Sequence, residues 1–407
     1  MSEAHLNFYY RMKIGINASF LRKQNTGIGQ VTANFLKKLA EFPISNFQFP
    51  NNKEVEFVLY LEEDIDFALS QILESSSVSF HKRVFLPLYK RDDLIRKLWW
   101  EKCLLPKMAK KDGCEVFLSL YQCPTIMSKG IRHIMVAHDL IPRLFPHYMN
   151  NWRKYAYQWL SEIGIKKADK IIAVSYRTEK DLVQYLGVDA AKITVSYIDV
   201  DEIYKKEVGK QESEDILKKY KLEAGYIYTG GGLEVRKNTE SVLRAYKILL
   251  EAYGHASWLP KVVVSGKMMP ELAPLVTDVE ALVEGLGLEK DAVLLGFVAQ
   301  EDLPVLYKNA TAFVYPSLYE GFGLPVLEAM NQGTPVITSK TSSLPEVGSD
   351  SVVYCDPKNV DDLAMVMKNV LTNNHLLAAL SLKGKERATH FSWERFVEKI
   401  LNIIKSN

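Results

Sequence analysis

The chain has 407 residues, of which 47% are hydrophobic and 25% are charged, and its formal net charge is +2. This length exceeds the roughly 100 to 200 residues of one domain, so we expect two domains, each with its own core. The composition is typical of a globular protein, and the small net charge gives no indication of nucleic-acid binding.

Targeting and redox features are few. No apolar run approaches the roughly 18 residues of a membrane span, and residues 1–10 lack the pattern of a secretion signal. The four cysteines have no Cys-x-x-Cys spacing, which indicates buried thiols of a reducing compartment; they are Cys103, Cys114, Cys123 and Cys355. We therefore expect a cytoplasmic protein.

Strand-like runs alternate with helical patterns through the first half of the chain. This alternation predicts parallel sheets wound with helices. The predicted strands are 13–17, 55–61, 116–120, 134–137, 171–174 and 193–196.

A polar stretch at 199–221 interrupts the alternation, which then restarts with a new strand. The second half has predicted strands at 226–229, 261–265, 293–295, 312–315, 335–338 and 352–354. After Ser392, a residue type favoured at helix N-caps, apolar residues recur at helical spacing and predict a terminal helix. We therefore predict an N-terminal domain at 1–205, a C-terminal domain at 206–390 and a final helical segment at 391–407.

The first predicted strand leads into Thr26-Gly27-Ile28-Gly29, which opens a helix through Leu39. A glycine turn before a helix can cradle an anion. A dinucleotide fingerprint would require a third glycine at position 32, where the chain has Thr32. The absence of this third glycine therefore argues against a nicotinamide cofactor. The two glycines also fit a tight turn with only a structural role.

The stretch 82–111 carries ten Lys or Arg against three Asp or Glu, interleaved with apolar residues that include Trp99 and Trp100. A basic, aromatic helix can lie on an anionic membrane surface. The same pattern fits a helix that packs its apolar face on the sheet. Both interpretations stay open, and the first would place the protein at the inner face of the membrane.

His138 and Asp139 follow the predicted strand 134–137. The carboxyl ends of parallel strands are where open α/β sheets bind ligands. Two acidic strings, Asp64-Ile65-Asp66 and Asp199-Val200-Asp201, have the spacing of an Asp-x-Asp metal motif. Neither string follows a clear buried strand or lies near a phosphate-binding motif. We interpret both strings as solvated turns and predict no metal and no cofactor.

The second half opens with Thr229-Gly230-Gly231-Gly232, followed closely by Arg236-Lys237-Asn238. Flexible backbone amides beside two cations can neutralise a diphosphate and stabilise it as a leaving group.

Glu320 and Glu328 flank a glycine-rich junction between a strand and a helix, Glu320-Gly321-Phe322-Gly323-Leu324-Pro325. The glycines allow close backbone approach, and the amides of the helix start favour an anion. Such a site suits a ligand with a phosphate and many hydroxyls, as in a sugar nucleotide.

These motifs together resemble the family-4 retaining glycosyltransferases of the GT-B fold. The resemblance rests on Glu-x7-Glu around Gly-Phe-Gly-Leu-Pro, on Gly-Gly-Leu-Glu-x-Arg-Lys-Asn and on His-Asp-Leu-x-Pro. It implies two Rossmann-like parallel-sheet domains facing a cleft, with the C-terminal helix crossing back to the first domain. One departure is Gly232, which stands near where many members carry a further Arg.

The resemblance also implies residue roles. The expected catalytic residues are Glu320, His138, Arg236 and Lys237. The expected substrate-binding residues are Gly27, Gly29, Asp139, Gly231, Phe297, Val298, Gly321, Phe322, Gly323, Leu324 and Glu328. Among them, Gly27 and Gly29 would reach the donor diphosphate, Phe297 and Val298 would frame the base, and Glu328 would bind the ribose hydroxyls.

The implied activity is that of a metal-independent, retaining hexosyltransferase. Its donor would be a UDP- or GDP-linked sugar, and its acceptor a hydroxyl of a glycan or lipid-linked oligosaccharide in cell-surface polysaccharide synthesis. Two alternatives stay open: a sugar-nucleotide 2-epimerase of the same fold, and a non-catalytic protein that binds nucleotide sugars.

Overall fold

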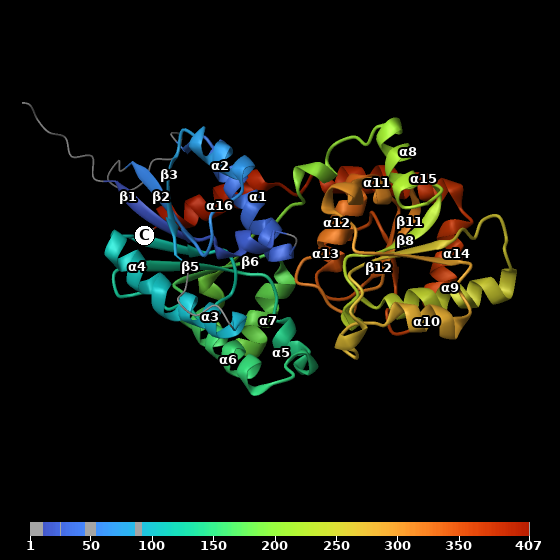
Figure 1. Cartoon of the computed structure of the whole chain (residues 1–407), viewed down its shortest axis with the longest axis horizontal. Coiled ribbons are helices and arrows are strands. Elements are labelled where there is room, and N and C mark those ends of the chain that lie inside the picture. The colour runs from blue at the N-terminus through green and yellow to red at the C-terminus, as the bar shows by residue number, and fades with distance from the viewer. Residues whose placement is uncertain (1–10, 25, 45–53, 86–91, 407) are drawn as a thin grey trace, which may run out of the picture. The chain divides into compact units, whose positions relative to one another are not determined.

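A computed structural model describes residues 11–24, 26–44, 54–85 and 92–406. The expectations for residues 1–10, and for 86–91 within the basic stretch, lie outside this range. The chain divides into two compact units (Figure 1). The first comprises residues up to Ile198 together with Ser392–Asn407, and the second comprises Asp199–Phe391.

The first unit is built on a seven-stranded sheet in the order β3-β2-β1-β4-β5-β6-β7. Every neighbouring pair of strands is parallel. The strands are β1 (Met12–Asn17), β2 (Val55–Leu61), β3 (Ser79–Val84), β4 (Val116–Ser119), β5 (Arg132–Ala137), β6 (Lys170–Ala173) and β7 (Ile193–Val195). Because both faces are covered by helices, most strands are continuous apolar runs.

The helices of the first unit connect these strands. They are α1 (Gly27–Glu41), α2 (Phe67–Glu74), α3 (Asp93–Trp99), α4 (Leu105–Asp112), α5 (Ile141–Leu144), α6 (Trp152–Lys167) and α7 (Tyr176–Leu186). A π-helical turn, Trp100–Leu104, joins α3 to α4. Trp100, Leu105 and Ala109 are buried against Tyr60 and Phe117 of the sheet. The apolar face of the basic stretch therefore packs on the domain's own core.

The final helix, α16 (Trp393–Lys405), belongs to the first unit, as expected. Ser392 caps it by accepting hydrogen bonds from two backbone amides. Its apolar stripe packs on α1, where Phe396 meets Phe35 edge to face at 6.1 Å between ring centroids. Lys38 pairs with Glu394 at 3.3 Å at the same contact.

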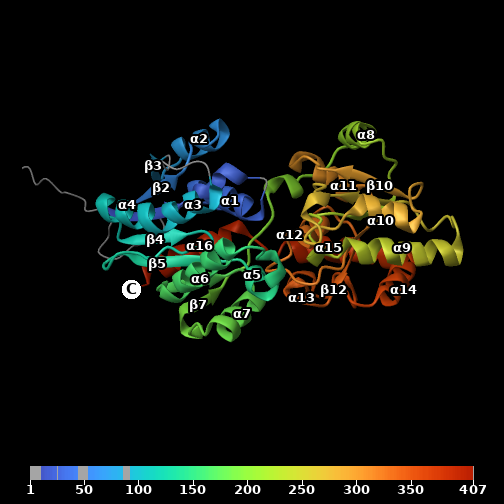
Figure 2. The same ribbon diagram turned by 60° about the horizontal axis from the view of Figure 1, so that its bottom comes forward.

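The second unit has a six-stranded sheet in the order β10-β9-β8-β11-β12-β13, again with all neighbouring pairs parallel. Its strands are β8 (Tyr226–Thr229), β9 (Val262–Ser265), β10 (Ala292–Gly296), β11 (Ala310–Tyr315), β12 (Val336–Ser339) and β13 (Val353–Cys355). Its helices, labelled in Figure 2, are α8 (Lys210–Lys219), α9 (Thr239–Tyr253), α10 (Val279–Leu286), α11 (Leu303–Lys308), α12 (Leu324–Asn331), α13 (Leu344–Gly348), α14 (Val360–Leu371) and α15 (Asn374–Ala388).

The division between the units falls at the start of the polar stretch, whereas we predicted it at 205/206. The stretch is anchored to the second unit, since the Gln332 amide donates to the Tyr204 and Lys206 carbonyls at 2.7 and 3.2 Å. Asp199 is buried and pairs with Lys205 at 2.6 Å, so interpreting it as a solvated turn was wrong. The polar composition of this stretch gave no indication of these hydrogen bonds and of this ion pair.

The expectation of four buried thiols also changed. Cys103 is exposed, whereas the other three cysteines are buried, and all four are free. Over the ranges given above, no helix is both long and apolar enough to span a bilayer.

Candidate active site

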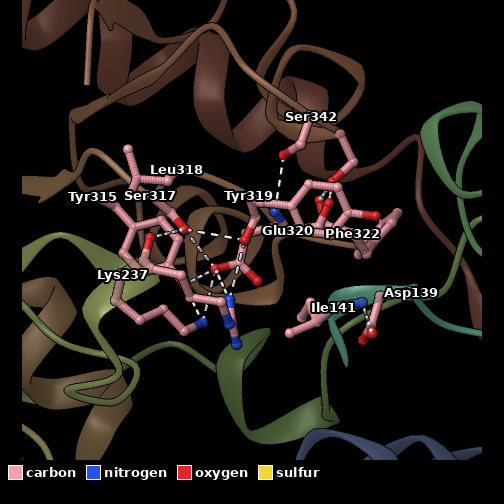
Figure 3. Close-up of polar contacts among 12 residues, drawn as sticks. Asp139, Ile141, Lys237, Tyr315, Ser317, Leu318, Tyr319, Glu320, Phe322 and Ser342 are labelled. Atoms are coloured by element: carbon pink, nitrogen blue, oxygen red, sulfur yellow. Dashed lines mark hydrogen bonds and ion pairs between the residues drawn. The ribbon is translucent and has the colours of Figure 1, made fainter. Parts of the chain in front are cut away.

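Glu320 forms the centre of a polar cluster in the turn between β11 and α12 (Figure 3). Its Oε1 atom accepts from Arg236 Nη1 at 2.8 Å and lies 2.9 Å from Lys237 Nζ. Tyr315 and Ser317 donate their hydroxyls to the same oxygen at 2.7 and 2.9 Å. All four contacts converge on Oε1, so the second oxygen, Oε2, stands outside this cluster.

The electrostatics of the cluster keep Glu320 ionised. Burial alone would raise the pKa of Glu320, but the charges of Lys237 and Arg236 outweigh burial and lower the pKa to about 2. Burial and the neighbouring Glu320 carboxylate raise the pKa of Tyr315 well above its ordinary value, so its hydroxyl stays a donor. Among the charged groups in contact with Glu320, two cations meet this one carboxylate.

Two loops are tied together to bring these charges into contact. Arg236 and Lys237 lie in a short 3-10 turn after β8. The Arg236 carbonyl accepts from the Leu318 amide at 2.8 Å, and the Asn238 side chain donates to the carbonyls of Pro316 and Pro357 at 3.1 and 2.8 Å. The cations are therefore fixed to the turn that carries Glu320.

The glycine loop after β8 packs on the first turn of α12. Gly231 has φ +90°, and a Cβ added there would lie 2.9 Å from Pro325 Cγ. A side chain at this position would push the loop away from the helix start. The loop backbone, the start of α12 and the two cations therefore meet in one place, which suits an anionic ligand.

Glu328 occupies a separate, buried position on α12. Its Oε2 accepts from the Tyr307 hydroxyl at 2.8 Å. Burial raises the pKa of Glu328 to about 7, although the Tyr307 hydrogen bond opposes the rise. Its role towards ribose stays a prediction. At the end of β10, Phe297 is exposed and Val298 is buried.

In the first unit, the glycine turn caps α1. Thr26 accepts from the Gly29 amide at 3.2 Å, and a Cβ on Gly29 would lie 2.0 Å from the Lys23 carbonyl oxygen. A Cβ on Gly27 would meet nothing within 4 Å. Gly29 is therefore required by packing, whereas nothing in its surroundings requires Gly27 to lack a side chain.

His138 is buried at the carboxyl end of β5. Its Nε2 donates to the Leu120 carbonyl at 2.8 Å, which leaves Nδ1 as the acceptor of the neutral ring. Burial lowers the pKa of His138, so the ring is neutral at pH 7. Asp139 accepts from the Ile141 amide at 2.9 Å and so supports the loop that begins α5.

Several cluster members had no sequence prediction. The sequence placed Tyr315 in a buried strand and gave it no role in the site. A polar hydroxyl at the end of a buried strand was the feature that could have indicated such a role. Ser342 and Ser343 hold the turn from the next loop: the Glu320 amide donates to Ser342 Oγ at 2.8 Å, and Ser343 Oγ donates to the Phe322 carbonyl at 2.7 Å. Serine is too common in loops for its sequence position to have indicated this.

The described part of the chain contains no group of three or more His, Cys, Asp or Glu side chains that could hold a metal ion. The positive charges near the glycine loop come from Arg236 and Lys237.

The two parallel-sheet units place the chain in the GT-B class of glycosyltransferase folds. Residues 210–387 match the family described as "Glycosyl transferases group 1", and residues 61–201 match "Glycosyltransferase Family 4". An O-antigen chain mannosyltransferase B of Escherichia coli is 31% identical over 67% of this chain and 70% of its own length. The chain therefore belongs to the family-4 glycosyltransferases.

Other curated relatives differ in length. The chain is 30% identical to the serotype-specific mannosyltransferase WbdA of Escherichia coli, but it spans only 32% of that protein. The O-antigen chain mannosyltransferase RfbU of Salmonella typhimurium is 24% identical over 87% of this chain and 90% of its own length.

Solved structures support the fold. The Anabaena protein HepE, solved with UDP and glucose, superposes with a TM-score of 0.70 at 16% identity, over 98% of this chain and 100% of that one. WaaG, a glycosyltransferase of lipopolysaccharide biosynthesis, gives a TM-score of 0.70 at 16% identity, over 97% and 100% of the two chains.

Proposed function

We propose that the protein is a retaining hexosyltransferase that acts without a metal ion. It transfers a hexose from a UDP- or GDP-linked sugar to a hydroxyl of a glycan or lipid-linked oligosaccharide. Relatives named as O-antigen mannosyltransferases favour mannose as the hexose and cell-surface polysaccharide synthesis as the setting. The donor is drawn from the cytoplasm, at the inner face of the membrane.

The pair of cations beside the glycine loop is the observation that carries the proposal. A donor diphosphate bound there gains charge-assisted hydrogen bonds from Arg236 and Lys237. Negative charge grows on the diphosphate as the bond to the sugar breaks, so these cations bind the transition state more strongly than the ground state. In this account they supply the charge stabilisation that a metal ion gives in other transferases.

The state of Glu320 argues against a covalent sugar–enzyme intermediate. Its Oε1 already accepts from four groups, and a carboxylate with a pKa of about 2 is a weak nucleophile. We assign Glu320 to orienting the cations and binding a sugar hydroxyl through Oε2. Acceptor attack and diphosphate departure then occur on the same face of the sugar, which retains its anomeric configuration. The departing diphosphate takes up the proton of the acceptor hydroxyl.

The neutral His138 ring has a role compatible with this mechanism. Because Nε2 donates to the Leu120 carbonyl, Nδ1 carries no proton and can accept a hydrogen bond from a sugar hydroxyl while the ring stays neutral. We assign His138 to supporting the donor sugar. The backbone that lines the donor site belongs to Gly231, Gly321, Phe322, Gly323 and Leu324.

A donor screen followed by product analysis tests this function. UDP- and GDP-linked hexoses are incubated with the full chain and glycan acceptors, and nuclear magnetic resonance reports the anomeric configuration of the product. We expect consumption of one donor class and a product with the configuration of the donor. An inverted product would contradict the mechanism. Conversion of the donor without transfer would show an epimerase, and binding without consumption would show a nucleotide-sugar-binding protein.

A further inference from the structure

Tyr204 is a buried tyrosine near the point where the chain enters the second unit. It lies in a short 3-10 turn, Glu202–Tyr204, within the polar stretch. Its side chain is 1% exposed, and its hydroxyl forms no hydrogen bond to any residue that the structure describes. A buried donor without an acceptor costs stability, so this hydroxyl needs an explanation other than its contribution to the fold.

The backbone of Tyr204 is fixed beside the helix that carries Glu328. Gln332 follows Glu328 by one helical turn and donates its side-chain amide to the Tyr204 carbonyl at 2.7 Å. The ring of Tyr204 meets the ring of Tyr307 edge to face, with 6.2 Å between centroids. Because the Tyr307 hydroxyl donates to Glu328 Oε2, the Tyr204 side chain is held close to the Glu328 carboxyl group.

Glu328 can accept more hydrogen bonds than the described residues give it. An ionised carboxylate has about four acceptor positions, and within the described chain Glu328 accepts from the Tyr307 hydroxyl alone. Burial raises the pKa of Tyr204, and the nearby charge of Glu328 raises it further, so the Tyr204 hydroxyl keeps its proton and remains a donor. A buried donor therefore lies beside an acceptor with free capacity.

We propose that Tyr204 is a positioning residue of the donor site, whose hydroxyl donates to the Glu328 carboxylate once Glu328 is ionised. The inference rests on the proposed function, in which Glu328 accepts from the ribose hydroxyls. A second hydroxyl donor fixes the orientation of the carboxylate. It also stabilises the charged form, because hydrogen bonds to ionised groups are stronger than those between neutral groups.

Other ionisable groups also surround Glu328. The groups whose charge or hydroxyl interacts with it are Tyr204, Tyr228, Tyr307, Lys237 and Asp201. Lys237 and the Tyr307 hydrogen bond lower the pKa of Glu328, whereas Asp201 raises it. Tyr228 shares a hydrogen bond with Ser265 at 2.6 Å. Of the three tyrosines, Tyr204 alone has a hydroxyl that bonds to none of the described residues.

Tyr204→Phe in the full chain tests the proposal through the pKa of Glu328. Carbon-13 nuclear magnetic resonance of the carboxyl groups measures this pKa, and the Glu328 signal is identified by its loss in Glu328→Gln. Removing a donor disfavours the ionised carboxylate, so we expect the pKa of Glu328 to be higher by about one unit in Tyr204→Phe. Tyr307→Phe removes a hydrogen bond that the structure shows, and it should raise the same pKa.

Donor binding should follow the same shift. In calorimetry with an intact nucleotide-sugar donor, Tyr204→Phe should bind about tenfold more weakly than the unmodified protein at pH 6, where Glu328 must lose a proton to bind. The two affinities should agree within about twofold at pH 8.5, where Glu328 is mostly ionised in both proteins. A hydroxyl with only a structural role would not produce a loss of affinity that disappears as pH rises.

Tyr226→Phe is the matched control. Tyr226 is buried on β8, and its hydroxyl donates to the Leu306 carbonyl at 2.8 Å. This variant should lower the denaturant midpoint, because it breaks a hydrogen bond, and it should leave the pKa of Glu328 unchanged. Tyr204→Phe should keep or raise the denaturant midpoint of the empty protein at pH 5, because it removes a hydroxyl that bonds to none of the described residues.

Two results overturn the proposal. One is an equal pKa of Glu328 in Tyr204→Phe and in the unmodified protein. The other is a fall of the denaturant midpoint in Tyr204→Phe as large as that in Tyr226→Phe, which would show that the Tyr204 hydroxyl is bonded elsewhere. If the pKa shift is present but donor affinity in the unmodified protein does not change with pH, the Tyr204 hydrogen bond stands and the ribose role of Glu328 fails.

Discussion

At the scale of single residues, the two glutamates of the site differ in charge state although they lie close in sequence, Glu320 in the turn before α12 and Glu328 on α12. Glu320 meets two cations and stays ionised, with a pKa of about 2. Glu328 meets a tyrosine hydroxyl in a buried place, and its pKa is raised to about 7. The surroundings of each carboxyl group therefore determine its protonation state, although the side chains are identical.

The raised pKa of Glu328 predicts a pH dependence of donor binding. If the ionised carboxylate accepts from the ribose hydroxyls, donor affinity should rise about tenfold between about pH 6 and pH 8. Calorimetry with an intact nucleotide-sugar donor measures this, because its diphosphate does not titrate in that range. Glu328→Gln should flatten the profile, and an unchanged slope in that variant would exclude the ribose role.

The same shift makes a stability prediction with the opposite sense. The folded protein keeps the Glu328 proton up to about pH 7, whereas the unfolded chain loses it near its ordinary value of 4.5. Glu328 therefore stabilises the fold fully below pH 4.5, and this contribution is lost as pH rises through 7. Denaturant unfolding at a series of pH values measures this. The unfolding free energy of Glu328→Gln, relative to that of the unmodified protein, should increase as pH rises.

Gly323 offers a test of backbone geometry at the start of α12. Its φ is +114°, and an added Cβ would lie 2.8 Å from Leu344 Cδ2. Gly323→Ala should cost about 1–3 kcal/mol of unfolding free energy and weaken donor binding. The control, Gly285→Ala in α10, meets nothing within 4 Å and should be neutral or stabilise by about 0.5–1 kcal/mol. Equal effects at both sites would contradict this account.

At the scale of elements, the segments with a clear apolar pattern were the ones that the sequence predicted correctly. The apolar strands and the helix after Ser392 were predicted and are present. Strand β3, Ser-Phe-His-Lys-Arg-Val, was not predicted, because it lies at the sheet edge and three of its four exposed residues are polar. Glycine and charge motifs located the site, but the hydroxyls of Tyr315 and Ser317 needed the folded turn to reach Glu320.

The element α16 makes a prediction of its own. Phe396 is fully buried against α1, so Phe396→Ala should cost about 3–5 kcal/mol of unfolding free energy. Glu398→Ala changes an exposed position of the same helix and should alter stability by less than about 0.5 kcal/mol. Denaturant unfolding compares the two variants. Similar stabilities would show that the helix contributes little to the first unit.

At the scale of the whole molecule, the two units differ in continuity. The second unit is one uninterrupted segment, whereas the first needs both Met1–Ile198 and Ser392–Asn407. The second unit also contains every residue of the proposed diphosphate cluster.

This organisation predicts the behaviour of fragments. A fragment of residues 199–391 should fold and bind the donor, since it keeps its sheet, core and cation cluster, but it should not transfer sugar. Circular dichroism and calorimetry measure folding and binding. A fragment of residues 1–198 lacks α16, and its uncovered apolar surface on α1 should make it aggregate. Sugar transfer by the 199–391 fragment would contradict the proposed role of His138.

The most direct test is the rate of sugar transfer by Glu320→Gln in the full chain. Replacing the carboxylate leaves Arg236 and Lys237 without their shared anion and removes the proposed contact to the sugar. We expect kcat to fall by at least about a hundredfold, or about 2.7 kcal/mol in activation free energy, with the protein still folded at the assay temperature. A folded Glu320→Gln protein that transfers sugar at the unmodified rate would contradict the central claim.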